Sequence, residues 1–316
     1  MFDICFVILN YNLYQDTISC VASIKNRIDT RRYKIIIVDN ASVNGAGELL
    51  REYFKNDQQI EIILLAKNIG FAKGNNIGIN QARLEGASFI CCINDDAEIL
   101  SKNFFQIINE KYTAFQPALI GPKIINRNGE IDDFSHPFRS IREYEEILER
   151  IKKETFGQYK KRKSLNLKSK VRSLVDQHKL SRRLFRQMKL RLRGIDPYKM
   201  SVPLYTQDTE DLVMSGCCLI FTPVFFKQLK GFNEATFLYW EEEFLQASML
   251  EKGLHSLYIP EIEILHKEGV STETLTSKKV KKKWSFMREH FIESLTMFLS
   301  YLKAHEKEIY KNEHRS

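Results

Sequence analysis

The sequence predicts an α/β protein built on a mostly parallel β-sheet with helices on both faces, and three observations support this prediction. Apolar runs of strand length lie at residues 4–9, 35–38, 60–65 (interrupted only by Glu61) and 89–93, as in strands that are covered on both faces. Amphipathic stretches at helical spacing separate these runs, and such alternation is typical of parallel sheets. The chain has 316 residues with 43% hydrophobic content, which is enough to bury a full core.

The elements follow one another in a definite order. A first helix is expected between the first two strands, where Ile18, Val21 and Ile24 recur at turn spacing. A loop entering a helix is expected over residues 70–81. After a basic segment, strand character returns at 213–221, an acidic helix is expected within 231–253, and short strands at 257–259 and 262–266. The chain then closes with an amphipathic helix, whose apolar stripe consists of Trp284, Met287, Phe291, Leu295, Phe298 and Leu302.

Composition excludes several classes of protein. No apolar run is long enough to span a bilayer, and no basic segment precedes the first apolar stretch as it would in a secretory signal. Four of the six cysteines form two adjacent pairs inside apolar runs, and no CxxC spacing occurs. Because neither a zinc site nor a disulfide framework fits this pattern, we expect a cytoplasmic protein with reduced, buried cysteines.

The net charge of +8 is concentrated in one segment. Residues 139–193 contain 19 Lys or Arg against 6 Asp or Glu, so the rest of the chain is mildly acidic. Three interpretations remain open: a solvated helical excursion, attraction to anionic lipid head groups at the inner membrane face, and binding of nucleic acid phosphates. Nucleic acid ranks last because the segment has few aromatic residues for base stacking. The C-terminal stripe could likewise meet a membrane, pack on the rest of the chain, or form a homodimer.

Polar residues follow each of the four predicted strands. They are Asn10-Tyr11-Asn12, Asp39-Asn40-Ala41-Ser42, the segment 68–76 and Asn94-Asp95-Asp96. One such end is ordinary turn chemistry, but ligands of open parallel sheets bind beyond the carboxyl ends of the strands. Four polar ends along one edge therefore favour a shared ligand site. A P-loop and a GxGxxG fingerprint are both absent.

Two acidic clusters are candidate chemical centres. Asp95 and Asp96 supply the oxygen ligands that Mg²⁺ and Mn²⁺ prefer. Taken alone, the two residues would be interpreted as a solvated turn. Next to a nucleotide pocket, they suggest that a diphosphate is bound through a metal ion. The second cluster, 241–243, follows an aromatic run. Two explanations of this cluster are open. Carboxylates in the first turn of a helix are stabilised by the helix dipole, which is a purely structural role; alternatively, one of them acts as a general base. At most two of the three side chains can point into one cleft, since successive residues are about 100° apart.

Seven stretches in order resemble the family 2 glycosyltransferases of the GT-A fold, particularly their bacterial rhamnosyltransferase-like branch. They are VILNYN ending at Asn12, IIIVDNAS ending at Ser42, NIGFAKGNNIGI from Asn68, INDDAEI around Asp96, MSGCCLIF from Met214, GFNEATFLYWEEEF from Gly231, and YIPEIEILHKEGVST ending at Thr272. The resemblance covers roughly residues 3–135 and 205–275. It implies a Rossmann-like nucleotide-diphospho-sugar transferase fold.

The resemblance also implies roles for the matched residues. Glu242 corresponds to the catalytic base and Glu241 to the acid before it. Asp96, in the family's DxD element, and His266 would hold Mn²⁺ or Mg²⁺, while Gly216 and Trp240 lie on the acceptor side. The nucleotide and donor sugar would be bound by Asn10, Tyr11, Asn12, Asp39, Asn68, Lys73, Asn75, Asn94, Asp95 and Asp96.

The resemblance implies an inverting, metal-dependent glycosyltransferase that uses a UDP- or dTDP-sugar as donor. The enzyme would be a hexosyl- or rhamnosyltransferase in the biosynthesis of bacterial surface polysaccharides or glycoconjugates. Its acceptor would be a saccharide, a lipid-linked saccharide or a glycoprotein. The enzyme would lie in the cytoplasm and bind peripherally at the inner face of the membrane. We expect four segments: a nucleotide-sugar-binding half (1–138), a basic helical insertion (139–195), an acceptor-binding and catalytic half (196–275) and a C-terminal helical extension (276–316).

Two departures from the family pattern keep an alternative open. The family's acidic helix resembles Glu-Asp-x-Asp with an Arg four positions further on, whereas this chain has Phe244 and Ser248 at the last two of these positions. These residues put the acceptor site in doubt. The alternative is a weakly active or non-catalytic sugar-nucleotide-binding subunit of a glycosyltransferase complex. A nucleotidyltransferase is disfavoured, because no Gly-rich loop with Arg or Lys follows the first strand.

Overall fold

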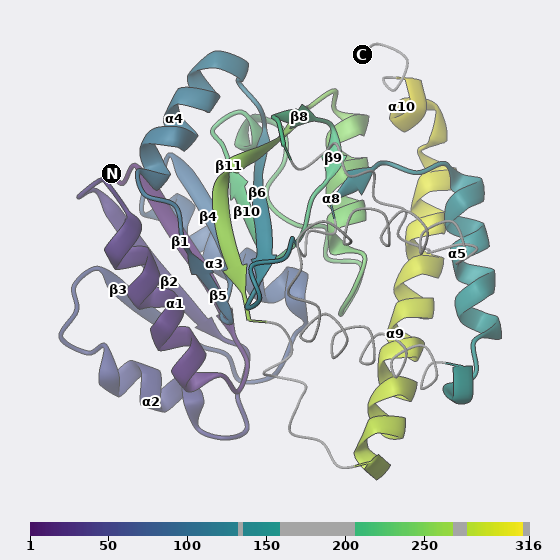
Figure 1. The fold of residues 1–316 in the computed structure, drawn as a ribbon, viewed down its shortest axis with the longest axis horizontal. Helices are drawn as coiled ribbons and strands as arrows, with labels where there is room; N and C mark the ends of the chain where they lie inside the picture. Colours follow the sequence, from purple (N-terminus) through teal and green to yellow (C-terminus); the bar gives the residue numbers. More distant parts are fainter. Residues whose placement is uncertain (132–134, 159–205, 268–276, 312–316) are drawn as a thin grey trace, which may run out of the picture.

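The computed structural model describes residues 1–131, 135–158, 206–267 and 277–311 (Figure 1). The first half alternates strand and helix as the sequence predicts. Its elements are β1 (Ile4–Asn10), α1 (Tyr14–Arg27), β2 (Tyr33–Asp39), α2 (Ala46–Tyr53), β3 (Ile60–Leu64), α3 (Phe71–Leu84) and β4 (Phe89–Asn94). The four strands are parallel in the order β3-β2-β1-β4. In this register Asn10 lies opposite Asp39, and Leu9 lies opposite Asn94. The polar strand ends therefore meet at one edge of the sheet.

The second half of the sheet is mixed. It consists of β5 (Ala97–Ile99), β6 (Leu119–Asn126), β8 (Thr209–Glu210), β10 (Cys218–Phe221) and β11 (Ser256–His266), with α4 (Phe104–Phe115) after β5. β10 runs antiparallel to both β4 and β6, and β11 runs parallel to β6 and antiparallel to β5. Within the described residues the sheet has nine strands. Parallel pairing thus dominates the first half of the sheet, while strand directions mix beyond β4.

Two predicted strands differ from the structure in detail. The run at 213–221 is divided into β9 (Leu212–Val213) and β10 by a turn that contains Gly216, and β9 pairs with β7 (His136–Pro137) in a separate small sheet. The two short strands expected at 257–266 form one strand, β11. Its register with β6 shifts between Ile259 and Glu263, at Pro260, whose nitrogen has no proton to donate to the ladder.

Helices cover both faces of the sheet, as expected. Residues of α1 and α4 pack on one face, and residues of α3 and α8 (Glu241–Glu251) pack on the other. A third apolar cluster joins the outer side of α8 to α5 (Ile141–Lys153), α9 (Ser277–Ala304) and α10 (Glu306–Lys311). Figure 1 shows α5 and α9 side by side at the edge of the molecule, beyond α8.

The predicted terminal segments are only partly described. Of the basic segment, α5 is helical as expected, while residues 159–205 lie outside the described part of the chain, and its three interpretations stay predictions. In α9 the predicted stripe is buried at Leu295, Phe298 and Leu302. Among the described helices, none is long and apolar enough to cross a membrane. All six cysteines lie within the described residues; they are buried, and none of them forms a disulfide.

Candidate functional site

The adjoining ends of β1 and β2 form a hydrogen-bonded polar cluster. Asn10 donates from Nδ2 to Oδ1 of Asp39 over 2.5 Å, and the backbone N–H of Ser42 donates to Oδ2 of Asp39 over 2.9 Å. The Oγ of Ser42 also accepts from the backbone N–H of Asn12, over 2.8 Å. Asp39 is 4% exposed. Ser42 is a residue of this site that sequence reasoning left without a role, although it ends one of the matched stretches.

Asn40 joins the end of β2 to the loop that enters α3. Its side-chain Oδ1 accepts from the N–H of Ile69 over 2.9 Å, and its Nδ2 donates to the carbonyl of Gly70 over 3.2 Å. Gly70 has φ of +90°, and a Cβ there would lie 2.4 Å from the carbonyl oxygen of Phe237. This contact requires glycine, and it sets the loop against the segment that precedes α8.

The residues predicted on that loop lie in different environments. The Oδ1 of Asn68 accepts from the N–H of Gly70, which is a local turn contact. Asn75 is buried, and its Nδ2 donates to the carbonyl of Phe71 within α3. Lys73 is exposed in the first turn of α3. Of these three residues, Lys73 has the side chain most accessible to a bound anion.

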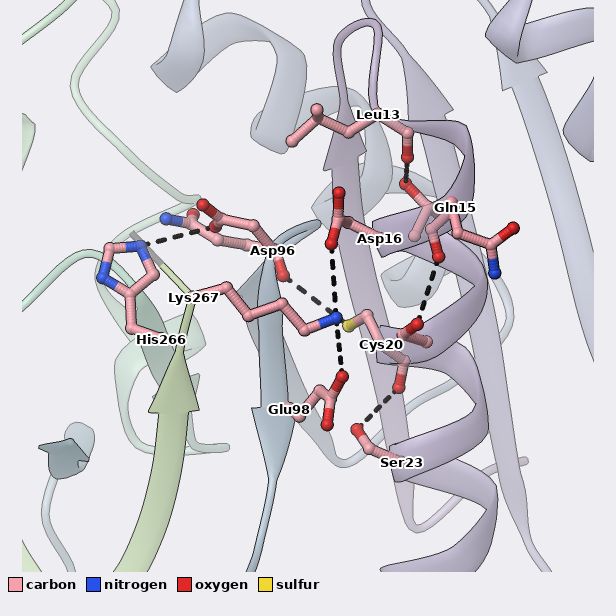
Figure 2. Close-up of polar contacts among 12 residues, drawn as sticks. Leu13, Gln15, Asp16, Cys20, Ser23, Asp96, Glu98, His266 and Lys267 are labelled. Carbon is pink, nitrogen blue, oxygen red and sulfur yellow. Dashed lines mark hydrogen bonds and ion pairs between the residues drawn. The ribbon is translucent and has the colours of Figure 1, made fainter. Parts of the chain in front are cut away.

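The predicted DxD element brings Asp96 opposite His266. Asp96 Oδ1 and His266 Nε2 are 3.4 Å apart, and Figure 2 shows the two side chains pointing toward each other. Asp95 instead accepts a hydrogen bond from the N–H of Tyr11 over 3.2 Å. Burial, and next the charge of Asp96, raise the pKa of Asp95 well above its usual range. Asp96 and His266 thus form the pair that sequence reasoning assigned to a metal.

An ion-pair cluster holds His266 in this position. The next residue, Lys267, donates its backbone N–H to the carbonyl of Asp96, and its Nζ lies 2.6 Å from Glu98 and 3.3 Å from Asp16 (Figure 2). Burial works to lower the pKa of Lys267, but the hydrogen bonds and charges of Glu98 and Asp16 outweigh it and raise that pKa. The end of β11 is therefore anchored to β5 and α1.

The metal-binding prediction can be tested against these donor atoms. Among the described residues, no three His, Cys, Asp or Glu side chains are grouped as metal ligands. Asp96 and His266 supply one carboxylate oxygen and one imidazole nitrogen, and His266 also lines a cavity. Mn²⁺ and Mg²⁺ bound with nucleotides are commonly held by one or two protein side chains plus phosphate oxygens and water. The residues present fit this arrangement.

Glu242 lies at the start of α8 and contacts the turn between β9 and β10. Its Oε1 accepts from the backbone N–H of Gly216 over 3.1 Å. A Cβ on Gly216 would lie 2.2 Å from that same oxygen. Gly216 and Glu242, both named from the sequence, are therefore in contact, and only glycine leaves room for the carboxylate.

Two carboxyl groups at the start of α8, those of Glu241 and Glu242, have pKa values above the ordinary value for Glu. Burial, and next the negative charge of Glu243, raise the pKa of Glu242 to about 7. Burial and the charge of Glu242 raise the pKa of Glu241 to about 8. A carboxylate with a pKa near neutrality is suited to accept a proton from a hydroxyl group and retain it.

The segment before α8 adopts a strained backbone. Tyr239 and Trp240 have φ of 74° and 70°, a left-handed conformation that bulky residues rarely adopt. Packing against α9 holds it in place. Trp240 is 6% exposed, its Nε1 donates to the carbonyl of Phe291, and Ser294 Oγ donates to the carbonyl of Leu238. Trp240, predicted on the acceptor side, combines this packing role with a position in the cavity wall.

The two departures from the family pattern lie on the opposite side of α8. The ring of Phe244 packs on Phe298 and Tyr301, with centroids 4.9 and 5.5 Å apart, and Ser248 Oγ lies 3.4 Å from the hydroxyl of Tyr301. Phe244 is 1% exposed. Both residues therefore make contact with α9, and the cavity lies elsewhere.

A cavity of about 1420 Å³ connects these parts. Asn94 and His266 line it near the ends of β4 and β11, and Gly216, Glu241 and Glu242 line its middle. Its far wall consists of side chains from α5 and α9: Ile147, Arg150, Ile151, Lys153, Met287, Arg288 and Phe291. The wall combines apolar surface with charged groups, as in sites that bind amphipathic ligands such as saccharides.

Sequence reasoning missed two residues of this cavity, His136 and Arg139, and gave Glu243 no role of its own within the cluster 241–243. Glu243 is 8% exposed, its Oε1 lies 3.5 Å from Nε2 of His136, and the same nitrogen lies 2.7 Å from Nη1 of Arg139. His136 and Arg139 are about a hundred residues from α8 in the sequence, and no local motif marks them. Only the pairing of β7 with β9 brings them together with the carboxylates.

Comparisons with known proteins agree with the fold. Residues 5–184, more than half of the chain, match the profile of the family described as Glycosyl transferase family 2. The low-salt glycan biosynthesis hexosyltransferase Agl10 of Haloferax volcanii is 30% identical over 131 residues, which is 40% of this chain and 38% of that protein. The chain thus spans well under half the length of this curated relative.

Two solved structures share the fold at low sequence identity. The crystal structure of S. aureus TarS 1–349 matches with a TM-score of 0.50 and 12% identity, covering 84% of this chain and 60% of that one. The crystal structure of GalNAc-T7 with UDP, GalNAc and Mn²⁺ matches with a TM-score of 0.52 and 13% identity, covering 96% of this chain and 57% of that one. These likenesses confirm the predicted GT-A fold.

Proposed function

Because the chain belongs to glycosyltransferase family 2, we propose that it transfers a sugar from a UDP- or dTDP-sugar to a hydroxyl group of an acceptor, with inversion at the anomeric carbon. The observation that carries this proposal is the position of Glu242: a carboxylate with a raised pKa lines the same cavity as His266, whose Nε2 lies 3.4 Å from Oδ1 of Asp96. A base and a diphosphate-binding pair on one cavity are what a direct displacement requires.

The donor half of the reaction would use the strand-end cluster. Asp39, fixed by Asn10 and Ser42, is placed to accept a hydrogen bond from the nucleoside, and Lys73 is placed to contact an anion. Asp96 and His266 would hold Mn²⁺ or Mg²⁺, which supplies charge stabilisation for the leaving diphosphate. GalNAc-T7, which shares the fold, was crystallised with UDP and Mn²⁺, and this supports both the nucleotide and the cation as candidates.

Glu242 would act on the acceptor. As the acceptor hydroxyl oxygen bonds to the anomeric carbon, Glu242 takes the hydroxyl proton, and the bond between that carbon and the diphosphate oxygen breaks with its electron pair going to the diphosphate. A single displacement from the opposite face inverts the configuration. The N–H of Gly216 orients the carboxylate, and side chains of α5 and α9 line the same cavity. A positioned base contributes about 10²- to 10⁴-fold in rate.

The acceptor would be a saccharide, free, lipid-linked or on a glycoprotein, in the assembly of a surface polysaccharide or glycoconjugate. The size and the mixed apolar and charged lining of the cavity support a ligand of this class. Peripheral contact with anionic membrane through residues 139–193 or the C-terminal helix remains part of the proposal. The alternative of a non-catalytic subunit was motivated by Phe244 and Ser248, and their contacts with α9 give both residues a packing role instead.

The proposal is tested by binding and turnover on matched variants. In calorimetric titrations of UDP and dTDP with and without Mn²⁺, we expect wild type to bind one nucleotide in a metal-dependent manner and Asp96→Ala to lose that dependence. In a donor-hydrolysis assay, Glu242→Gln should abolish turnover and keep nucleotide affinity. Glu251→Gln, the same chemical change at the far end of α8, serves as control and should retain both. Turnover by Glu242→Gln, or no nucleotide binding by wild type, would overturn the proposal.

A further inference from the structure

Lys267 places a largely buried ammonium group between carboxylates of two different elements. Its Nζ lies 2.6 Å from Oε1 of Glu98 in β5 and 3.3 Å from Oδ1 of Asp16 in the first turn of α1 (Figure 2). The side chain of Lys267 is 12% exposed. Because breaking a buried ion pair leaves a charge without compensation, these three groups hold one another in place. The mechanism proposed above gives none of them a role.

The backbone of Lys267 connects this ion-pair cluster to the proposed cation site. Its N–H donates to the carbonyl oxygen of Asp96 over 3.0 Å, and the preceding residue, His266, lies opposite Ala97 in the pairing of β11 with β5. Lys267 is thus hydrogen-bonded to Asp96 and covalently joined to His266. A displacement of Lys267 would change the relative position of these two side chains, whose Oδ1 and Nε2 atoms are 3.4 Å apart.

Both carboxylates of the cluster belong to elements that are fixed by hydrogen bonds of their own. At the start of α1, Oδ1 of Asn10 accepts from the N–H of Leu13 over 3.2 Å and from the hydroxyl of Thr17 over 3.0 Å. Further along α1, Oγ of Ser23 accepts from the N–H of Ile99 in β5 over 3.0 Å. The end of β11 is therefore attached to a frame that α1, β1 and β5 form together.

We propose that Lys267 is a positioning residue, whose ion pairs fix the end of β11 and thereby hold His266 and Asp96 in place to bind one divalent cation. The inference rests on the proposed function, because it takes this pair as the site of Mn²⁺ or Mg²⁺. Groups behind a metal ligand affect metal affinity because they orient the ligand before the metal binds.

The sign of the effect separates positioning from simple electrostatics. Lys267 is positively charged and directly follows a proposed cation ligand, so its charge by itself repels a cation. If repulsion were its whole influence, Lys267→Met would strengthen the binding of Mn²⁺. A positioning role predicts the opposite, because a released strand end lets His266 and Asp96 move apart, and bringing them together again reduces the affinity.

The test is a titration with Mn²⁺ followed by electron paramagnetic resonance, in the presence of whichever of UDP and dTDP the wild type binds. Lys267→Met should weaken Mn²⁺ binding about 10-fold, the lower end of the effect of residues behind a metal ligand, because Lys267 acts through the backbone. Lys267→Arg keeps the charge and several donors and should restore most of the affinity. Nucleotide affinity in EDTA should be the same in all three proteins, because the contacts between Asn10 and Asp39 do not involve Lys267.

Lys34→Met is the matched control. Nζ of Lys34 lies 2.7 Å from Glu61 and 2.8 Å from Glu85, and its side chain is 13% exposed. The variant therefore removes the same kind of group, near the start of β2 and away from the polar strand ends. Both methionine variants should lower the midpoint of urea unfolding, but Lys34→Met should bind Mn²⁺ as the wild type does. An equal loss of Mn²⁺ affinity in both would reflect destabilisation alone and would overturn the inference.

The remaining outcomes separate this inference from the proposed function. Unchanged or tighter Mn²⁺ binding by Lys267→Met would overturn the inference and leave the proposed function standing. If this variant does not fold, the double variant Asp16→Asn with Lys267→Met removes one charge of each sign. It should also weaken Mn²⁺ binding, and unchanged binding would overturn the inference. A wild type that binds no Mn²⁺, or an Asp96→Ala variant that binds it equally well, would overturn the proposed cation site itself.

Discussion

At the scale of single residues, the candidate site depends on atoms that a larger side chain would displace. Gly216 donates its N–H to Glu242, and its missing Cβ leaves the space that the carboxylate occupies. Gly70 similarly admits the carbonyl of Phe237 next to the donor loop. Both glycines are needed because of close approach to another group, a reason that is specific to each position.

Gly216→Ala should therefore impair catalysis and spare binding. The new methyl group would lie 2.2 Å from Oε1 of Glu242 in the present arrangement, so the flexible carboxylate must move and lose its hydrogen bond. We expect turnover to fall about 100-fold, the lower end of what a positioned base contributes. Nucleotide affinity and stability should change little. Gly157→Ala, at an open position in the structure, is the control, and equal turnover in both variants would contradict the role assigned to Gly216.

At the scale of elements, α9 packs on the side of α8 that faces away from the cavity. Its aromatic residues pack on Phe244 and Trp240 of the α8 region, and its backbone and side chains bind the strained segment before α8. Where the family pattern has an acid and an Arg, this chain has Phe244 and Ser248, and both side chains contact α9. This explains the two departures by the burial of one helix face against another.

Phe298→Ala should destabilise the protein by about 3 kcal/mol, because it empties the centre of the cluster formed by Phe244, Tyr144 and Trp240. Met297→Ala, the neighbouring and 41% exposed position, should cost far less. Urea unfolding monitored by tryptophan fluorescence measures both. Equal costs would mean that α9 does not pack on α8 as described.

At the scale of the whole molecule, the cavity is assembled from parts distant in the sequence. The sheet edge contributes the proposed nucleotide side, α8 contributes the proposed base, and α5 and α9 contribute further lining residues. Collecting three carboxylates at the start of α8 has an energetic consequence for the entire fold. The pKa values of about 8 and 7 for Glu241 and Glu242 lie above the ordinary value of 4.5, so the folded state binds protons that the unfolded state releases.

Stability should therefore decrease as pH rises from about 5 to 8. The stabilisation from these protonated carboxyls is complete below pH 4.5 and is lost as pH passes their folded pKa values. Glu242→Gln should flatten this decline in urea unfolding measured across that range. Glu251→Gln should leave the slope unchanged, because the pKa of Glu251 is lowered in the fold and its stabilisation is lost only in more acidic solution. An identical slope in wild type and Glu242→Gln would contradict the burial of this carboxylate.

The sequence by itself determined the order of most elements and the edge of the sheet that carries the polar strand ends. Apolar runs specify strands whose parallel register places Asn10 beside Asp39, and short motifs marked Asp96, His266, Gly216 and Glu242. Local pattern carries this information because strand periodicity and strand-end chemistry act over a few residues. The mixed direction of β10 and the merging of the last strands into β11 were not specified in this way.

Only the tertiary structure decided which side chains surround the carboxylates. His136, which also contacts Arg139, meets Glu243 through the pairing of β7 with β9, and Phe244 meets Phe298 through the packing of α8 on α9. Neither contact has a local signal, since each depends on long-range packing between segments that share no motif. The same long-range burial raises the pKa of Glu242, because the removal of water around a carboxyl group is a property of the assembled fold and of no single segment.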